Sequence, residues 1–166
     1  MSKVLTFSRV FPSYHPRKGE PTYFVEKITR SLHEQGLKPW DILNKIFSNE
    51  MYYICEAKHH TIRAGHRWKV GDKFSPRVWS GKPYQSKQII IAPDIEIKKV
   101  WDIRIHTIAH WINYSGMMFP IDYKELAKND GLSTKDFLDW FGNPTQKGFK
   151  DVFFGQIICW NENIEY

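Results

Sequence analysis

The stretch "KHHTIRAGHRWKVGD", residues 58–72, decides how the rest of the chain is interpreted. It combines two lysines, two arginines and three histidines with a threonine, a tryptophan and two glycines. The apolar run "MYYIC", residues 51–55, directly precedes it. Four interpretations are open for such a stretch: a solvated basic loop, a metal site, a nucleic-acid contact, or the reactive edge of an active site.

Metal binding is the weakest of these four interpretations. Two of the histidines are adjacent, and adjacent side chains on a strand point to opposite faces, so they would not reach one ion. No HExxH spacing occurs, and the two cysteines, Cys55 and Cys159, form no CxxC pair. We therefore expect no metal. A plain basic loop is also disfavoured, because Ile62, Trp68 and Val70 interrupt the charges and two glycines stand where a tight turn needs them.

Composition sets the class of protein and of ligand. The chain of 166 residues suits one domain, residues 1–166, with a proper core. Its net charge of +6, its pI near 9.2 and its aromatic share of 16% favour a nucleoside, nucleotide or RNA as partner. No signal peptide and no run of about 18 apolar residues is present, so we expect a cytoplasmic protein with no membrane partner.

The N-terminal part predicts one strand followed by helices. "KVLTF" is a strand candidate at residues 3–7, and the proline-rich residues 12–21 form a loop. Thr22 can cap a helix that Gly36 ends, because Val25, Ile28 and Leu32 recur at helical spacing. A second short helix fits "PWDILNKIFSN", residues 39–49.

From residue 51 onward the pattern favours strands. "MYYICEA" predicts a buried strand at residues 51–57, and residues 72–85 a strand that ends in a turn. Residues 87–113 predict one long strand or a hairpin, in which Ile95 to Ile105 alternate with polar residues and Lys99 and Val100 break the register. Two helices begin at the capping pairs Asp122 with Glu125 and Ser133 with Asp136; a turn at 143–148 and a closing strand at 151–160 follow. The fold class is α+β, a small β-barrel or strongly curved sheet with peripheral helices.

Reactive chemistry is the fourth interpretation of the opening stretch. Lys58 and Thr61 lie three residues apart, and Arg63 follows. A threonine hydroxyl becomes a nucleophile when a base accepts its proton, and a lysine serves as that base if its pKa is lowered. A guanidinium such as that of Arg63 suits a phosphate or a developing oxyanion. Taken alone, the Lys-x-x-Thr spacing occurs in many proteins.

At this point the sequence resembles a known family. Lys58, Thr61, Ile62 and Arg63, followed by "VGD" at 70–72, resemble the signature of the ASCH domain, part of the PUA-like superfamily. "ELAKNDGLSTKDFLDWF" is similar to a later helix-loop-helix of that family, with Asp130 at its acidic position, and "FFGQIICW" to its last barrel strand. The resemblance covers residues 1–7 loosely and 51–166 well, and it leaves a helical insertion at about 20–48.

The resemblance implies a PUA-like barrel with a cleft beside the threonine. Relatives of known activity are small, metal-independent amidohydrolases that remove the acetyl group from N4-acetylcytidine. Their catalytic lysine, threonine and glutamate correspond to Lys58 as base, Thr61 as nucleophile and Asp130 as the acid that holds the lysine. No cofactor is implied. The aspartate is one methylene shorter than the glutamate of those relatives. We expect substrate or RNA contacts from five further residues: Arg63, His60, Arg67, Trp68 and Lys69.

Three functions follow as hypotheses. The first is an enzyme that hydrolyses an N-acylated cytidine-type amide. The second is a non-catalytic RNA-binding module, and the third is an adaptor whose N-terminal helices dock a protein partner. An acid paired with Lys58 favours the first, a broad basic face with exposed aromatic residues the second, and an exposed apolar patch on residues 22–47 the third.

Overall fold

The structure is a computed structural model that describes residues 2–37, 46–106, 112–114, 117–119, 122–141 and 152–166. Its strands are β1 (Lys3–Phe7), β2 (His60–Ala64), β3 (Lys73–Trp79), β4 (Gln88–Ile90), β5 (Ile95–Glu96), β6 (Lys99–His106), β7 (Ile112–Tyr114), β8 (Met117–Phe119) and β9 (Val152–Cys159). Its helices are α1 (Phe24–Glu34), α2 (Asn49–Ile54), α3 (Tyr123–Asn129) and α4 (Thr134–Phe141).

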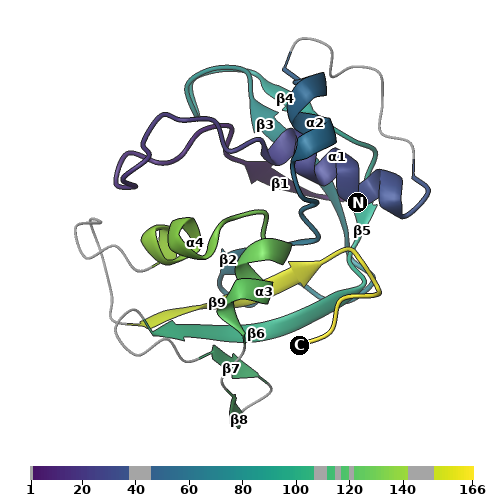
Figure 1. The fold of residues 1–166 in the computed structure, drawn as a ribbon. Helices are drawn as coiled ribbons and strands as arrows, with labels where there is room; N and C mark the ends of the chain where they lie inside the picture. The colour runs from purple at the N-terminus through teal and green to yellow at the C-terminus, as the bar shows by residue number, and fades with distance from the viewer. Residues whose placement is uncertain (1, 38–45, 107–111, 115–116, 120–121, 142–151) are drawn as a thin grey trace.

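Two main sheets organise these elements (Figure 1). In the first, β1 runs parallel to β3, and β4 and β5 pair with β3 in the antiparallel sense. In the second, β9 lies between β2 and β6, with both pairs antiparallel. The short strands β7 and β8 pair with each other in a separate antiparallel sheet beside β6. The α+β class is thus confirmed. No strand ladder joins the two main sheets within the described ranges, so the closed PUA-like barrel stays a prediction.

Aromatic side chains fill the space where the two sheets meet. Phe7 of β1 and Phe74 of β3 both contact Trp160, which directly follows β9, at ring-centroid distances of 6.2 and 5.8 Å. All three side chains are buried. Burying rings of this size is the largest single hydrophobic contribution a small domain has.

The period-two pattern before residue 106 is confirmed, although the single long strand is not. Ile95, Ile97, Trp101, Ile103 and Ile105 are all buried, as the alternation predicts. The chain is divided into β4, β5 and β6, because the "IAPD" segment places Pro93 between β4 and β5 and proline cannot donate to a ladder. At the predicted register break the chain crosses between sheets: the Ile97 amide donates to Asp72 of the first sheet's border and that of Lys98 to Cys159 of β9.

The strand predicted at residues 51–57 is wrong. Residues 49–54 form α2, which begins because the Ser48 hydroxyl accepts a hydrogen bond from the Met51 amide at 3.3 Å. Tyr53 and Ile54 are 76% and 67% exposed, so this apolar run is not a buried strand at all. The helix predicted at 39–49 lies largely outside the described residues; within them, 46–48 are not helical and Asn49 opens α2.

The other predicted helix starts are close to those observed. α1 begins one residue later than expected, with Tyr23, whose φ is 56°, at the N-cap; the Thr22 hydroxyl still accepts a hydrogen bond of 3.4 Å from the Phe24 amide and donates to the Ser8 carbonyl. Gly36 ends the helix with a φ of +74°. Asp122 caps α3, and Ser133 and Asp136 form a side-chain-to-backbone cap on α4. The closing strand is confirmed as β9, whereas the turn at 143–148 lies outside the described residues.

Candidate active site

Lys58 and Asp130, which are 72 residues apart in sequence, form a buried ion pair. The Lys58 Nζ lies 2.7 Å from the Asp130 Oδ1 and also donates a hydrogen bond to the Asp130 backbone carbonyl. The two residues are only 1% and 4% exposed. Two charges withdrawn from water in this way are costly unless they are paired, and the 2.7 Å contact supplies the partner.

Backbone contacts bring the two residues together. Lys58 precedes β2, and its amide donates to the Lys27 carbonyl of α1 at 3.0 Å. The next amide, of His59, donates to the Asn129 carbonyl at the end of α3 at 2.8 Å. The chain entering β2 is therefore held between α1 and the α3–α4 turn, and Asp130 belongs to that turn.

Gly131 makes this close approach possible. Its φ is +75°, and a Cβ at this position would lie 3.1 Å from the Lys58 Cβ. A side chain would both strain the backbone and push against Lys58. The Gly131 carbonyl also accepts a hydrogen bond of 2.7 Å from the Lys27 Nζ. The sequence shows Asp-Gly as a turn, and the structure adds that the turn fits around the lysine.

Helix α1 covers the ion pair. The Lys58 Nζ lies 4.3 Å from the centroid of the Phe24 ring, within the range of a cation–π contact. Its three N–H donors therefore face the Asp130 carboxylate, the Asp130 carbonyl and the Phe24 ring. The segment predicted as an insertion at about 20–48 thus supplies a wall of the site.

Burial and the charge of the partner shift the pKa values of Lys58 and Asp130 in opposing directions. Burial lowers the pKa of Lys58 from 10.5 to about 8; Asp130 opposes this shift, and the cations Arg63 and Lys27 add to it. Burial alone would raise the pKa of Asp130, but the charge of Lys58 and the contact with His60 outweigh it, so that this pKa lies below 3.8. Asp130 is consequently ionised at pH 7, and Lys58 loses its proton far more readily than an ordinary lysine.

His60 stands on the other side of Asp130. It is fully buried, its Nδ1 lies 3.5 Å from the Asp130 Oδ1, and its ring packs edge-on against Tyr166 at 5.6 Å. Burial lowers the pKa of His60, so the imidazole is neutral near pH 7. Neither ring nitrogen has a well-formed hydrogen bond within the described part of the chain. His60 therefore packs beside the Asp130 carboxylate, and its buried ring is not accessible to an RNA strand.

Thr61 and Arg63 occupy the same face of β2, since side chains two residues apart share a face of a strand. Thr61 pairs with Ile158 of β9 and is 5% exposed. Arg63 is partly buried, and its guanidinium donates to the Thr6 carbonyl at 2.6 Å. Burial lowers the pKa of Arg63 while Asp130 raises it, so the guanidinium lies within electrostatic reach of that carboxylate.

The remaining predicted contact residues lie on the loop after β2. Arg67 and Lys69 are exposed, whereas Trp68 between them is 2% exposed. Two cations lie over the Trp68 ring, Arg67 at 5.0 Å and Lys3 at 5.1 Å from its centroid. Trp68 is therefore a core residue whose face is already covered, and it is not an open stacking platform in this conformation.

Three site residues carry no functional signal in the sequence. Phe24 and Lys27 belong to a helix whose apolar spacing indicates ordinary packing, and Gly131 is typical of a turn. Only the fold shows that they surround Lys58. As for metals, no cluster of three or more potential ligands occurs among the described residues. His59, the neighbour of His60, bonds instead to Ser31 at 2.8 Å.

Comparison with known proteins identifies no relative: no protein-family model, no curated protein and no solved structure matches this chain. The membership of the ASCH family therefore rests on the residues of the opening stretch and stays a prediction. Within the ranges that the structure describes, no helix has the length and apolar character needed to span a bilayer.

Proposed function

We propose that this chain is an ASCH-type amidohydrolase that cleaves the acyl amide of an N-acylated cytidine such as N4-acetylcytidine. The observation that carries the proposal is the buried Lys58–Asp130 pair, in which the pKa of Lys58 is lowered to about 8. A general base works best when its pKa lies near the operating pH. An unperturbed lysine, near 10.4, is almost wholly protonated at pH 7, whereas about a tenth of a lysine with a pKa of 8 is neutral.

The proposed reaction uses three side chains. Neutral Lys58 accepts the proton of the Thr61 hydroxyl, and the Thr61 Oγ attacks the amide carbonyl carbon. The resulting oxyanion faces the Arg63 guanidinium. When the C–N bond breaks, the Lys58 ammonium returns the proton to the departing amine, which leaves as cytidine. A water molecule, deprotonated by the same lysine, then hydrolyses the acyl ester on Thr61 and releases the carboxylate.

The shorter acid is compatible with this role. Asp130 reaches Lys58 at 2.7 Å, although glutamate would be one methylene longer. The turn itself lies close to the lysine: Gly131 has a positive φ, a Cβ added there would come within 3.1 Å of the Lys58 Cβ, and the Asp130 carbonyl also accepts from Nζ. Close approach of the backbone thus replaces side-chain length. To reach Thr61, Lys58 exchanges one of its two contacts with Asp130, as catalytic hydrogen bonds commonly form only when substrate is bound.

The direct test is release of cytidine by the purified chain, followed by liquid chromatography and mass spectrometry. The rate should rise with pH and level off above about 8, because the active form of Lys58 is the one without its proton and its pKa is about 8. Buffer without protein gives the spontaneous rate at each pH. No release above that rate at high protein concentration would contradict the proposal.

RNA binding by the loop after β2 is the second candidate, because His66, Arg67 and Lys69 are exposed there within four residues. Single-stranded RNA should bind at low salt. Replacing both cations, by Arg67→Gln with Lys69→Gln, should reduce the salt slope by about 0.7 for each phosphate that the protein no longer neutralises. Titration at several salt concentrations measures this slope. A chain with no RNA affinity at low salt would exclude this candidate.

The adaptor hypothesis gains little from the structure. Phe24, Val25, Ile28 and Leu32 of α1 are all buried against the rest of the chain. Among the described residues of 22–47, Leu37 is the one large apolar side chain that is strongly exposed, at 52%. One side chain is not an interface, so a protein partner of these helices stays a prediction.

A further inference from the structure

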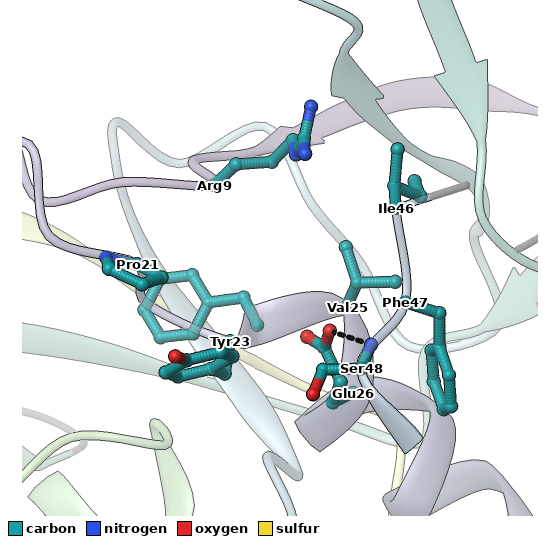
Figure 2. A pocket seen from close by; sticks show the side chains of 9 residues that line it. Arg9, Pro21, Tyr23, Val25, Glu26, Ile46, Phe47 and Ser48 are labelled. Atoms are coloured by element: carbon teal, nitrogen blue, oxygen red, sulfur yellow. Dashed lines mark hydrogen bonds between the residues drawn. The ribbon is translucent and has the colours of Figure 1, made fainter. Parts of the chain in front are cut away.

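A pocket lies at the start of α1 (Figure 2), and Phe24, whose ring contacts Lys58, is one of the residues that line it. Its volume is about 280 Å³. That is close to the lower end of the range of roughly 300–1,000 Å³ that is usual for small-molecule sites. Segments far apart in sequence line it: residues 9–26 on one side and 46–48 on the other.

The floor of this pocket is a buried carboxylate. Glu26 is 4% exposed, and its Oε1 accepts a hydrogen bond of 2.8 Å from the Ser48 amide (Figure 2). No lysine, arginine or histidine among the described residues forms an ion pair with it. Its position in the first turn of α1 gives some stabilisation from the helix dipole. A desolvated carboxylate with one hydrogen bond still has acceptor positions to satisfy, and a ligand with N–H donors would satisfy them.

An unpaired cation stands at the opposite end. Arg9 lies across the pocket from Glu26 in Figure 2, and its guanidinium makes one hydrogen bond, of 3.3 Å, to the Ser80 carbonyl. It has no carboxylate within 4.0 Å in the part of the chain that the structure describes. A separated anion and cation in one pocket are complementary to a ligand with donors at one end and a negative charge at the other.

The lining between these charges is one aromatic ring with apolar side chains around it. The Tyr23 ring lies on one side, and Pro21, Val25 and Ile46 complete the lining (Figure 2). Tyr23 has a φ of 56°, a conformation that is uncommon and unfavourable for a non-glycine residue, and such strain is often found at ligand-binding positions. An aromatic face flanked by apolar side chains suits a planar heterocycle.

We propose that this pocket binds a guanine nucleotide. The base stacks on the Tyr23 ring and presents its adjacent ring N–H and amino group to the Glu26 carboxylate, while the phosphate pairs with Arg9. Adenine and cytosine fit less well, because each presents a ring nitrogen acceptor beside its amino group, and that acceptor would face the carboxylate. The inference goes beyond the proposed amidohydrolase and does not depend on it, because Lys58, Thr61 and Asp130 are not among the residues that line this pocket.

The test is isothermal titration of the full chain with GMP, guanosine, AMP, CMP and inorganic phosphate. GMP should bind most tightly, with AMP and CMP about 10-fold weaker, because neither base presents the complementary pair of donors. Guanosine should bind more weakly than GMP but retain preference over adenosine. Equal affinities for the three nucleotides would show phosphate binding alone and overturn the proposal, as would no GMP binding.

Variants locate the binding in this pocket. Glu26→Gln should weaken GMP by about 10-fold or more, because the amide replaces one acceptor by a donor and removes the charge. Arg9→Gln should lower GMP affinity to that of guanosine and leave guanosine unchanged. The matched control is Glu50→Gln on the exposed surface of α2, which should change nothing. If Glu26→Gln fails to fold, the guanosine-to-GMP comparison in Arg9→Gln decides; an unchanged GMP affinity there rejects the site.

Discussion

Thr61→Ala should reduce cytidine release from N4-acetylcytidine by about 10⁴-fold or more, because removing the nucleophile of a covalent mechanism removes most of its catalysis. Lys58→Met should cost about 10²–10⁴-fold, the usual contribution of a general base. The two losses should not add when the variants are combined, since each abolishes the same proton transfer. Chromatography with mass detection of cytidine measures all three rates.

Further variants serve as controls for this prediction. Thr61→Ser keeps the hydroxyl and removes the methyl group, and it should keep most of the activity. If Thr61 mattered only because its methyl group packs in the fold, Thr61→Ser would lose activity as Thr61→Ala does. Lys135→Met removes an exposed lysine and should leave the rate unchanged. Asp130→Glu introduces the longer acid of the amidohydrolases that the sequence resembles; because the turn around Gly131 already brings the backbone close to Lys58, we expect this variant to have a lower rate. Full activity of Thr61→Ala would reject the assigned nucleophile.

The second large effect concerns stability. Asp130→Ala should lower the free energy of unfolding by about 3–5 kcal/mol at pH 7, because it leaves the ammonium of Lys58 buried without its counter-ion. Urea denaturation followed by tryptophan fluorescence measures this difference. The chain provides a matched control in the exposed pair Lys135–Asp139, whose N–O distance is 2.6 Å. Asp139→Ala should cost only about 0.3–0.5 kcal/mol, as exposed helix pairs do.

The pH dependence of this effect has a defined sign. The folded-state pKa of Asp130 is depressed below its ordinary 3.8. The stability that its ionisation contributes is therefore present above pH 3.8 and is lost as the pH falls through the lower folded-state pKa. The difference in free energy of unfolding between wild type and Asp130→Ala should stay constant from pH 7 to 5 and become smaller in stronger acid. If this difference in free energy of unfolding already vanishes near pH 6, the carboxylate is not stabilised by Lys58.

Patterns among neighbouring residues predict those elements that short-range geometry determines. The alternation before residue 106 and the capping residues Asp122 and Ser133 depend on short-range geometry, and each prediction is confirmed. The strand predicted for the apolar run at 51–57 is wrong because composition alone does not separate a strand from a helix with exposed rings. The serine cap before it, Ser48, is the better signal.

The site is predictable only in part for the same reason. The contact of Lys58 with Asp130 is expected from the order of motifs. The surroundings of that pair are not, because Phe24 and Lys27 come from a helix that no motif includes. Two residues expected to contact ligand, His60 and Trp68, are instead deeply buried. The expectation rested on residue type alone. Burial depends on pairing with β9 and on packing between sheets, which the residue type does not encode.

The 72-residue separation of Lys58 and Asp130 has a consequence for how the amine acquires its reactivity during synthesis. At about 5–20 residues per second, a ribosome needs roughly 4–15 s to add the chain between them. Throughout that interval the α3–α4 turn, which completes the burial of Lys58, has not yet been synthesised, and burial is what lowers the pKa of this lysine. The shifted amine therefore arises only when that turn docks, late in the formation of the fold.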